Sequence, residues 1–297
     1  MSNRLSVVSL AVILAQAAPA AAQERHIEVA PGERLRVVEA GSGAPVVLIP
    51  GLFGSAFGFR KLVEPLVDSG HRVLVVEPLG IGGSAKPEQA DYSLTAQADR
   101  IAAVLQSLEL DPAVVVAHSV GASMAFRLAA RHPERVRAIV SLDGGPAEAA
   151  ATPGFRRAMS FAFLIKLFGG VKRIQGMVRS TLKERSADPA WVTDEVVTGY
   201  MSAGAGDLDG TLTAFRRMAK APEPQQLRPR LSEVRCPVRL VIGTATREGG
   251  ISDAEIALLQ ERLPDFSIDR VEGAGHFVFE EHPQAVVAAV LSVGGRR

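Results

Sequence analysis

The sequence predicts an α/β fold in which a mostly parallel, eight-stranded sheet is covered by helices on both faces. Short apolar runs recur along the chain, and amphipathic helix-like stretches separate most of the later ones. Runs that are apolar throughout are typical of parallel strands buried on both sides. The alternation stops between residues 144 and 235, where the texture is helical. This interruption indicates a helical insertion within the α/β core.

The individual elements follow from the same periodicity. The first two strand-like runs are close together, which predicts that an antiparallel pair opens the sheet. The expected strands are residues 25–29, 35–40, 46–49, 73–76, 113–117, 136–142, 238–242 and 267–271. The main expected helices of the core are residues 93–108, 120–131, 253–263 and 283–291.

The insertion, residues 147–230, is expected to form a helical cap over a core made of residues 23–146 and 231–297. Thr152-Pro153 has the pattern of an N-cap and a first helical residue, and Asp188-Pro189 repeats it. Apolar positions continue both helices and mark a third: Phe155, Met159, Phe163, Leu167, Phe168, Trp191, Val192, Val196, Tyr200, Leu212, Phe215 and Met218. Most of these side chains pack against the core, and some are expected to face a pocket.

Composition limits the classes of function. The 297 residues are 47% hydrophobic, enough for a large core, and the net charge of +1 gives no reason to invoke nucleic acid or an anionic membrane. The single cysteine, Cys236, cannot form an internal disulfide. No Cys/His cluster has metal-ligand spacing, so neither a metal nor a cofactor is expected. The oligomeric state stays open.

The first 22 residues have the pattern of a signal peptide. Arg4 gives a positive start, residues 5–14 are mostly apolar, and Ala20-Ala21-Ala22 resembles a cleavage site before Gln23. The apolar run is shorter than the roughly 20 residues that span a bilayer. We therefore expect export to a bacterial periplasm or the medium, without a stable membrane anchor.

The most informative segment is AHSVG at residues 117–121. It lies between the strand-like run 113–116 and the helix-like run 122–131, and it places a small residue two positions away on each side of Ser119. This is the pattern of a nucleophile elbow, in which a sharp turn exposes the serine hydroxyl at the end of a strand. Small flanking residues are required because larger ones would collide with neighbouring backbone. Ser119 is therefore the candidate nucleophile.

Further motifs occur in order around this elbow. They are PGLFG at 50–54, EPLGIGGS at 77–84, GAGHF at 273–277 and EEHP at 280–283. Together these segments resemble the alpha/beta-hydrolase superfamily, from about residue 25 to about residue 292. The resemblance implies an oxyanion hole formed by the backbone N–H groups of Leu52 and Val120, and a catalytic histidine at His276. Two positions depart from the usual pattern: Pro50 replaces a histidine, and Glu77 replaces an aspartate.

The position of the catalytic acid is unusual. Members of the superfamily commonly carry an aspartate after the next-to-last strand, and Thr246 stands there in this sequence. Some members use an acid one strand after the nucleophile, and Asp143 matches that position, seven residues after Val136. The order Ser119, Asp143, His276 is also the family order. Asp143 is our candidate, Glu248 and Asp253 are the alternatives, and a turn or capping role for Asp143 stays open.

The resemblance and the motifs predict a serine hydrolase that cleaves carboxylic esters or similar acyl bonds of a small, lipophilic substrate. Phe53, His118, Phe163 and Phe277 are the expected pocket residues, with packing as the alternative for His118. A serine nucleophile argues against epoxide hydrolases and haloalkane dehalogenases, which use aspartate at that position. The competing hypotheses are a perhydrolase or carbon–carbon bond hydrolase of the same fold, and a non-catalytic ligand-binding protein.

Overall fold

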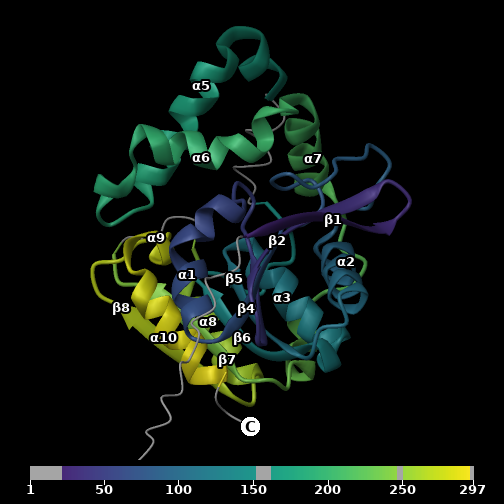
Figure 1. Ribbon diagram of the computed structural model, residues 1–297, viewed down its shortest axis with the longest axis vertical. Coiled ribbons are helices and arrows are strands. Elements are labelled where there is room, and N and C mark those ends of the chain that lie inside the picture. Colours follow the sequence, from purple (N-terminus) through teal and green to yellow (C-terminus); the bar gives the residue numbers. More distant parts are fainter. Residues whose placement is uncertain (1–21, 152–161, 246–249, 295–297) are drawn as a thin grey trace, which may run out of the picture.

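A computed structural model describes residues 22–151, 162–245 and 250–294, with the side chains of 162–171 and 205 left out. Its centre is an eight-stranded sheet (Figure 1). The strands are β1 (Gln23–Ala30), β2 (Glu33–Gly41), β3 (Ala44–Ile49), β4 (His71–Val76), β5 (Ala113–His118), β6 (Val136–Leu142), β7 (Val238–Gly243) and β8 (Phe266–Val271). Every expected strand is present within these bounds.

The strand order is β1-β2-β4-β3-β5-β6-β7-β8. The pairs β1/β2 and β2/β4 are antiparallel, and the remaining pairs are parallel. The predicted opening pair and the mostly parallel sheet are therefore confirmed. Strands β3, β5, β6 and β7 end at one edge, and the loops that leave this edge bring distant motifs together.

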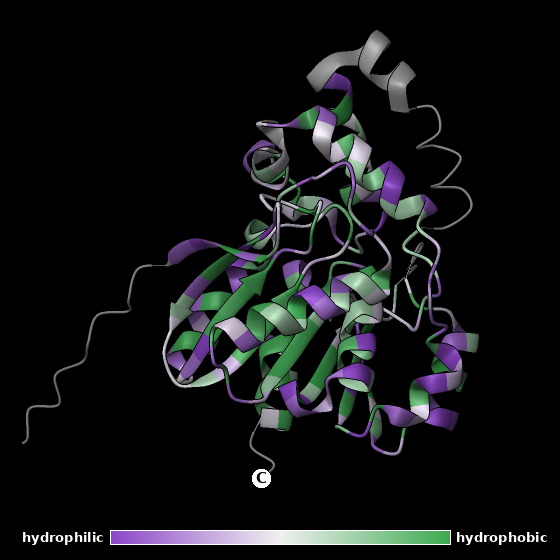
Figure 2. Cartoon of the chain, turned by 90° about the vertical axis from the view of Figure 1, so that its right-hand side faces the viewer, coloured by the Kyte–Doolittle hydropathy of each residue, from purple (hydrophilic) through white to green (hydrophobic). Residues whose placement is uncertain are grey.

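Helices cover both faces of the sheet (Figure 1). One apolar core contains residues of α2 (Leu94–Ser107), α3 (Val120–Arg131) and α8 (Asp253–Arg262). The other contains residues of α1 (Arg60–Asp68), α9 (Val278–Glu281) and α10 (Pro283–Gly294). The central strands are apolar along their length, whereas the helices carry polar residues on their outer side (Figure 2). This arrangement explains the uniform strands and amphipathic helices of the sequence.

The four expected core helices are present, and their starts have local causes. Ser93 caps α2 by accepting a hydrogen bond from the N–H of Ala96. Ser252 and Glu255 form a capping box at the start of α8. Helix α1 was not predicted, because Pro65 stands in its interior and proline usually ends a helix.

The insertion between β6 and β7 contains α5 (Ala162–Glu184), α6 (Asp194–Ala205) and α7 (Leu208–Lys220), which lie above the sheet in Figure 1. The predicted third helix corresponds to α7. The expected start at Thr152-Pro153 lies outside the described residues.

The second predicted helix start was wrong. Asp188 caps only the 3-10 turn Pro189–Trp191, and α6 begins five residues later, after Thr193. The Thr193 hydroxyl accepts a hydrogen bond from the N–H of Val196 at 3.3 Å. Acidic residues also occupy the first turn of α6, where their negative charge interacts favourably with the positive end of the helix dipole. The later cap therefore starts the helix.

A buried arginine holds the two stems of the insertion together. Arg127 of α3 is 2% exposed and pairs with Glu148 at 3.1 Å and with Glu223 at 3.5 Å. Glu148 follows β6, and Glu223 lies after α7. Glu148 also accepts the N–H groups of Leu227 and Arg228 at 2.9 and 2.7 Å. A buried cation requires such partners, so both stems are fixed to the same helix.

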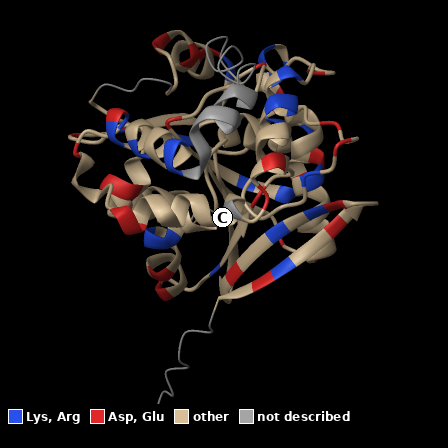
Figure 3. Cartoon of the chain, turned by 90° about the horizontal axis from the view of Figure 1, so that it is seen from above, with Lys and Arg blue, Asp and Glu red and all other residues tan. Residues whose placement is uncertain are grey.

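Neither charge, hydropathy nor a cluster of metal-ligating side chains singles out a site in the described part of the chain. Acidic and basic residues are interspersed on the face seen from above (Figure 3). None of the described helices is long and apolar enough to cross a bilayer. In the same residues, no three histidine, cysteine, aspartate or glutamate side chains gather as metal ligands would.

Candidate active site

Ser119 lies at the turn between β5 and α3. Its backbone has φ 54° and ψ −125°, in a region that non-glycine residues rarely adopt. The side chain is partly accessible, unlike the buried strand that precedes it. The N–H of Ser119 donates to the carbonyl of Leu142 at 3.0 Å, which ties the turn to the end of β6. The elbow therefore presents the hydroxyl in a strained and fixed conformation.

Two glycines allow backbone to approach this turn closely. A Cβ on Gly121 would lie 2.8 Å from the carbonyl oxygens of Ile49 and Pro50, so a side chain there would displace β3 or the loop after it. A Cβ on Gly51 would lie 3.2 Å from Cβ of Ser119. Leu52 follows Gly51, and Val120 follows Ser119 at the start of α3. The residues of the two expected oxyanion donors are therefore chain neighbours of Gly51, which approaches the serine, and of the serine itself.

His276 and Asp143 form a buried pair. Nδ1 of His276 is 2.6 Å from Oδ2 of Asp143, and their side chains are 2% and 0% exposed. Asp143 immediately follows β6 and has φ 46°, a second left-handed conformation at this edge. Its N–H donates to the carbonyl of Val241 at 3.0 Å. The distance lies within the range of a strong hydrogen bond between an imidazole N–H and a carboxylate.

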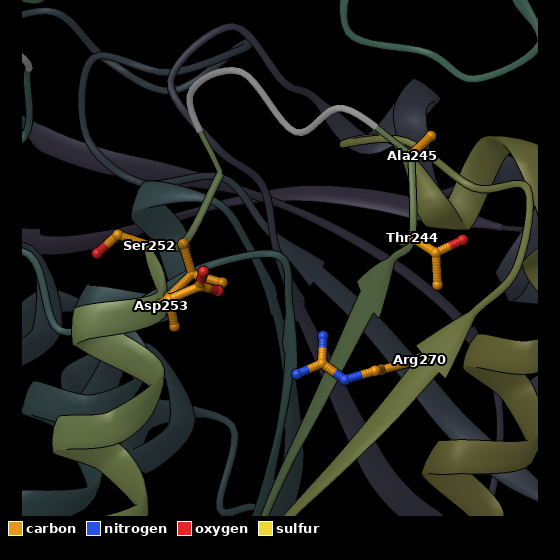
Figure 4. Close-up of a pocket in the computed structure, with 7 residues that line it drawn as sticks. Thr244, Ala245, Ser252, Asp253 and Arg270 are labelled. Carbon is orange, nitrogen blue, oxygen red and sulfur yellow. The ribbon is translucent and has the colours of Figure 1, made fainter.

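The usual acid position follows β7, in a loop that the structure describes only in part. Thr246 and Glu248 lie outside the described residues. Asp253 is exposed in the first turn of α8. It lines a cavity of about 510 Å³ beside Thr244, Ala245, Ser252 and Arg270 (Figure 4). A Cβ on Gly250 would lie 2.2 Å from Oδ2 of Asp143, so the loop after β7 reaches the Asp143 carboxylate.

His118 lies beside the pair. It is 6% exposed, and its Nε2 is 3.1 Å from the carbonyl oxygen of His276. Burial lowers the pKa of His118 well below its ordinary value, and the nearby His276 lowers it further. The ring is therefore neutral near pH 7. Because a carbonyl can only accept, Nε2 carries the proton, and His118 holds the backbone of His276.

Glu77 is a residue whose role the sequence reasoning missed. Its buried carboxylate accepts the N–H of Ala56 at 2.7 Å and the N–H of Gly83 at 2.6 Å, and it pairs with Arg36 at 3.0 Å. It thereby connects the turn after β4 to the segment that follows the expected oxyanion loop. The signal was available, since Glu77 replaces an aspartate at a family position.

The expected pocket residues occupy different environments. Phe53 is 47% exposed, and its ring meets the ring of Phe215 from α7 edge-on at 5.1 Å. Phe277 is buried, and its ring contacts His276 and Trp191 at centroid distances of 5.2 and 5.8 Å. The side chain of Phe163 lies outside the described residues. Aromatic side chains from the core and the insertion therefore meet around the motifs.

Comparison with protein families matches residues 44–166 to a model described as the alpha/beta hydrolase fold. Bifunctional epoxide hydrolase 2 of Sus scrofa is 38% identical over 126 residues, which are 42% of this chain and 23% of the relative. The chain thus spans under a quarter of that protein's length. 2-(Acetamidomethylene)succinate hydrolase of Mesorhizobium japonicum is 27% identical over 259 residues, covering 87% of this chain and 90% of the relative.

Among solved structures, bromoperoxidase from Bacillus anthracis superposes with a TM-score of 0.76 at 18% identity, covering 92% of this chain and 100% of the other. At this identity the likeness concerns the fold. The family model, the sheet topology and the elbow lead to the same assignment. The chain has the alpha/beta-hydrolase fold, and its residues 44–166 match the family model for that fold.

Proposed function

We propose that the protein is a serine hydrolase that cleaves carboxylic ester bonds, or similar acyl bonds, of a small substrate with a lipophilic part. The observation that carries this proposal is the buried contact of 2.6 Å between His276 and Asp143, at the sheet edge where the strained elbow of Ser119 is hydrogen-bonded to the end of β6. A serine at this position separates the chain from relatives that use aspartate, such as epoxide hydrolases.

In the proposed mechanism, His276 accepts the proton of Ser119 as the hydroxyl oxygen attacks the acyl carbonyl. Asp143 holds the imidazole in the tautomer with Nδ1 protonated, so that Nε2 can accept, and stabilises the imidazolium that forms. His276 then protonates the leaving alcohol. Water attacks the acyl-enzyme by the same general-base route and releases the acid.

The backbone N–H groups of Leu52 and Val120 are the proposed oxyanion donors. The N-terminus of α3 adds a positive partial charge at the same place. One such donor contributes roughly 10²–10³ in rate in studied enzymes. The position of Gly51 against Ser119 supports this assignment, because the loop carrying Leu52 lies directly beside the nucleophile.

The lipophilic character of the substrate is proposed from the aromatic residues near the site. Phe53 is exposed beside the oxyanion loop and contacts Phe215 of the insertion. We propose that the insertion, residues 147–230, is a lid that selects substrates by size, and that Phe163 contributes to it. Phe215→Ala should change the ranking of esters of different acyl length more than it lowers their mean rate.

The function is tested with p-nitrophenyl esters from acetate to dodecanoate and with a fluorophosphonate probe. Wild-type protein should hydrolyse the esters and become labelled, and Ser119→Ala should do neither. Ser107→Ala is the matched control, because Ser107 is exposed at the end of α2. A wild-type protein that neither turns over esters nor labels would favour the non-catalytic ligand-binding hypothesis.

A second candidate is suggested by the relative from Mesorhizobium japonicum, which aligns with most of this chain. The same nucleophile could act on a carboxylate-bearing compound such as 2-(acetamidomethylene)succinate. Including that compound in the assay separates the two candidates, because a specialised enzyme would turn it over with a kcat/KM well above that of the best ester.

We also propose that the chain is exported and cut near Ala22, on the basis of Arg4, the apolar residues 5–14 and Ala20-Ala21-Ala22. N-terminal sequencing of the protein from its native host should give Gln23 or a close neighbour. A mature chain that begins at Met1 or Ser2 would contradict the signal peptide.

A further inference from the structure

The backbone of His276 is held from two sides, one of which belongs to the insertion. Its carbonyl accepts from Nε2 of His118 in the core, at 3.1 Å. Its N–H donates to the carbonyl of Arg185 at 2.8 Å. Arg185 directly follows α5, about ninety residues before the histidine. A segment of the insertion thus contacts the proposed general base directly.

Glu281 joins the same two parts. One carboxylate oxygen accepts the N–H of Gly275 at 2.8 Å, next to His276. The other accepts the N–H groups of Ala187 and Asp188, at 2.7 and 2.9 Å. Three backbone donors therefore converge on one carboxylate. Charge-assisted hydrogen bonds of this kind are stronger than neutral ones, so Glu281 clamps the histidine loop to residues 185–188.

The two segments fit together without space for a side chain. A Cβ on Gly275 would lie 2.5 Å from the carbonyl oxygen of Arg185 and 2.8 Å from the N of Ala187. On its other side, the segment is fixed to α5 and to the following turn. The hydroxyl of Ser186 donates to Leu182 at 2.7 Å and accepts from the indole N–H of Trp191 at 3.1 Å.

The neighbouring glutamate makes a different set of contacts. Glu280 is buried and pairs with Arg60 at 2.5 Å, and it accepts the hydroxyl hydrogen of Tyr200 at 2.9 Å. It therefore ties α9 to α1 and to α6. Of the two adjacent carboxylates, Glu281 is the one that holds the backbone on the N-terminal side of His276.

We propose that Glu281 is a positioning residue for His276, with residues 185–188 as the second half of the clamp. The inference rests on the proposed serine-hydrolase function and deepens it: the insertion is part of the catalytic machinery as well as a lid. A general base must stay within hydrogen-bond reach of the nucleophile, and an error of about 1 Å in placement can reduce the rate about 10²-fold.

The test compares Glu281→Ala and Glu281→Gln with Glu272→Gln, an exposed carboxylate in the turn before the histidine loop. The number of competent sites is measured by exhaustive fluorophosphonate labelling, and kcat is expressed per labelled site. We expect Glu281→Ala to lower kcat per site about 10- to 100-fold with KM within about twofold of wild type. Glu281→Gln should lose less, because one oxygen remains, and Glu272→Gln should match wild type.

A second variant approaches the clamp from the other side. Gly275→Ala should force residues 185–188 away from the loop and lower kcat per site by a similar factor. Gly176→Ala is its control, because Gly176 lies in α5 with nothing within 4 Å of the added methyl group. If Glu281→Ala does not fold, the test uses kcat per labelled site of Glu281→Gln and Gly275→Ala, each relative to wild type.

A purely structural role predicts a different result: fewer competent sites but a wild-type kcat at each. Either that result or full activity in both Glu281→Ala and Gly275→Ala overturns the proposal. Failure of the underlying function is distinguishable, because then the wild-type protein itself neither hydrolyses esters nor labels.

Discussion

Strands β6 and β7 are parallel neighbours that end at the same edge, yet their ends hold different parts of the histidine loop. The end of β6 supplies Asp143, whose carboxylate meets the ring of His276. The end of β7 binds backbone: Thr244 accepts the N–H of Gly273 at 3.3 Å, and the N–H of Ala245 donates to Ala274 at 3.1 Å. In this chain, ring and backbone are therefore held by different strands. The acid can lie on either strand provided that its carboxylate reaches Nδ1.

The largest effect tests whether this edge serves a nucleophile at all. Ser119→Ala should reduce ester turnover roughly 10⁵–10⁶-fold, since the remaining groups of a triad contribute little without the nucleophile. Circular dichroism and thermal unfolding should be unchanged, because the substitution removes one partly accessible hydroxyl. Turnover that survives in this variant would show that the β6 and β7 ends support another chemistry.

The next effect separates the two strand ends directly. Asp143→Asn should lower kcat by about 10⁴, because the amide no longer fixes the productive tautomer or stabilises the imidazolium. Asp111→Asn, at an exposed position before β5, is the control for the same change of charge. Steady-state kinetics on a single p-nitrophenyl ester give the ratio. Near-normal turnover in Asp143→Asn would show that the catalytic acid is not Asp143 at the end of β6.

The loop after β7 should matter much less. Glu248→Gln and Asp253→Asn are each expected to change kcat less than about tenfold, or about 1.4 kcal/mol in the barrier. Asp253 is exposed at the start of α8, where its charge favours the helix dipole, so a small loss of thermal stability is expected from that variant. A loss of several orders of magnitude in kcat in either variant would show that the catalytic acid lies after β7, at the usual position.

The smallest effect concerns the opposite end of β7. Cys236 precedes the strand, and burial raises the pKa of its thiol to about 12. At pH 8 only about one thiol in 10⁴ is then ionised, so a thiol reagent should react slowly and leave activity unchanged. Labelling is expected to become fast once the protein is unfolded in denaturant. Rapid modification of the native protein would indicate that this end of β7 opens readily.

Local patterns predicted the elements and motifs well. The eight strands, the antiparallel opening pair and four helices follow from periodicity, because each depends on neighbouring residues. The elbow and the location of Asp143 at a strand end could also be predicted, because each is marked by residues close to it in the sequence. Helix α1 was missed because Pro65 indicates a break, and α6 was started too early because two capping signals stand five residues apart.

What the sequence could not indicate are contacts between distant segments. Glu281 and Ala187 are 94 residues apart, and no local pattern marks either as the partner of the other. The same holds for Arg127 with Glu148 and Glu223. Such contacts depend on the completed fold, in which the loops at one sheet edge converge. They also include the groups that we propose to position the histidine.

The pairing of Arg127 with both stems has a consequence for how this protein can diverge. The chain between Glu148 and Glu223 is a loop whose ends are already fixed to one helix. Doubling the length of such a loop costs only about 0.6 kcal/mol in closure entropy. Where its residues neither pack into the two apolar cores nor belong to residues 185–188, the insertion can therefore gain or lose length at little cost in closure entropy. New substrate ranges can arise in this part of the sequence while Ser119, Asp143 and His276 keep their positions.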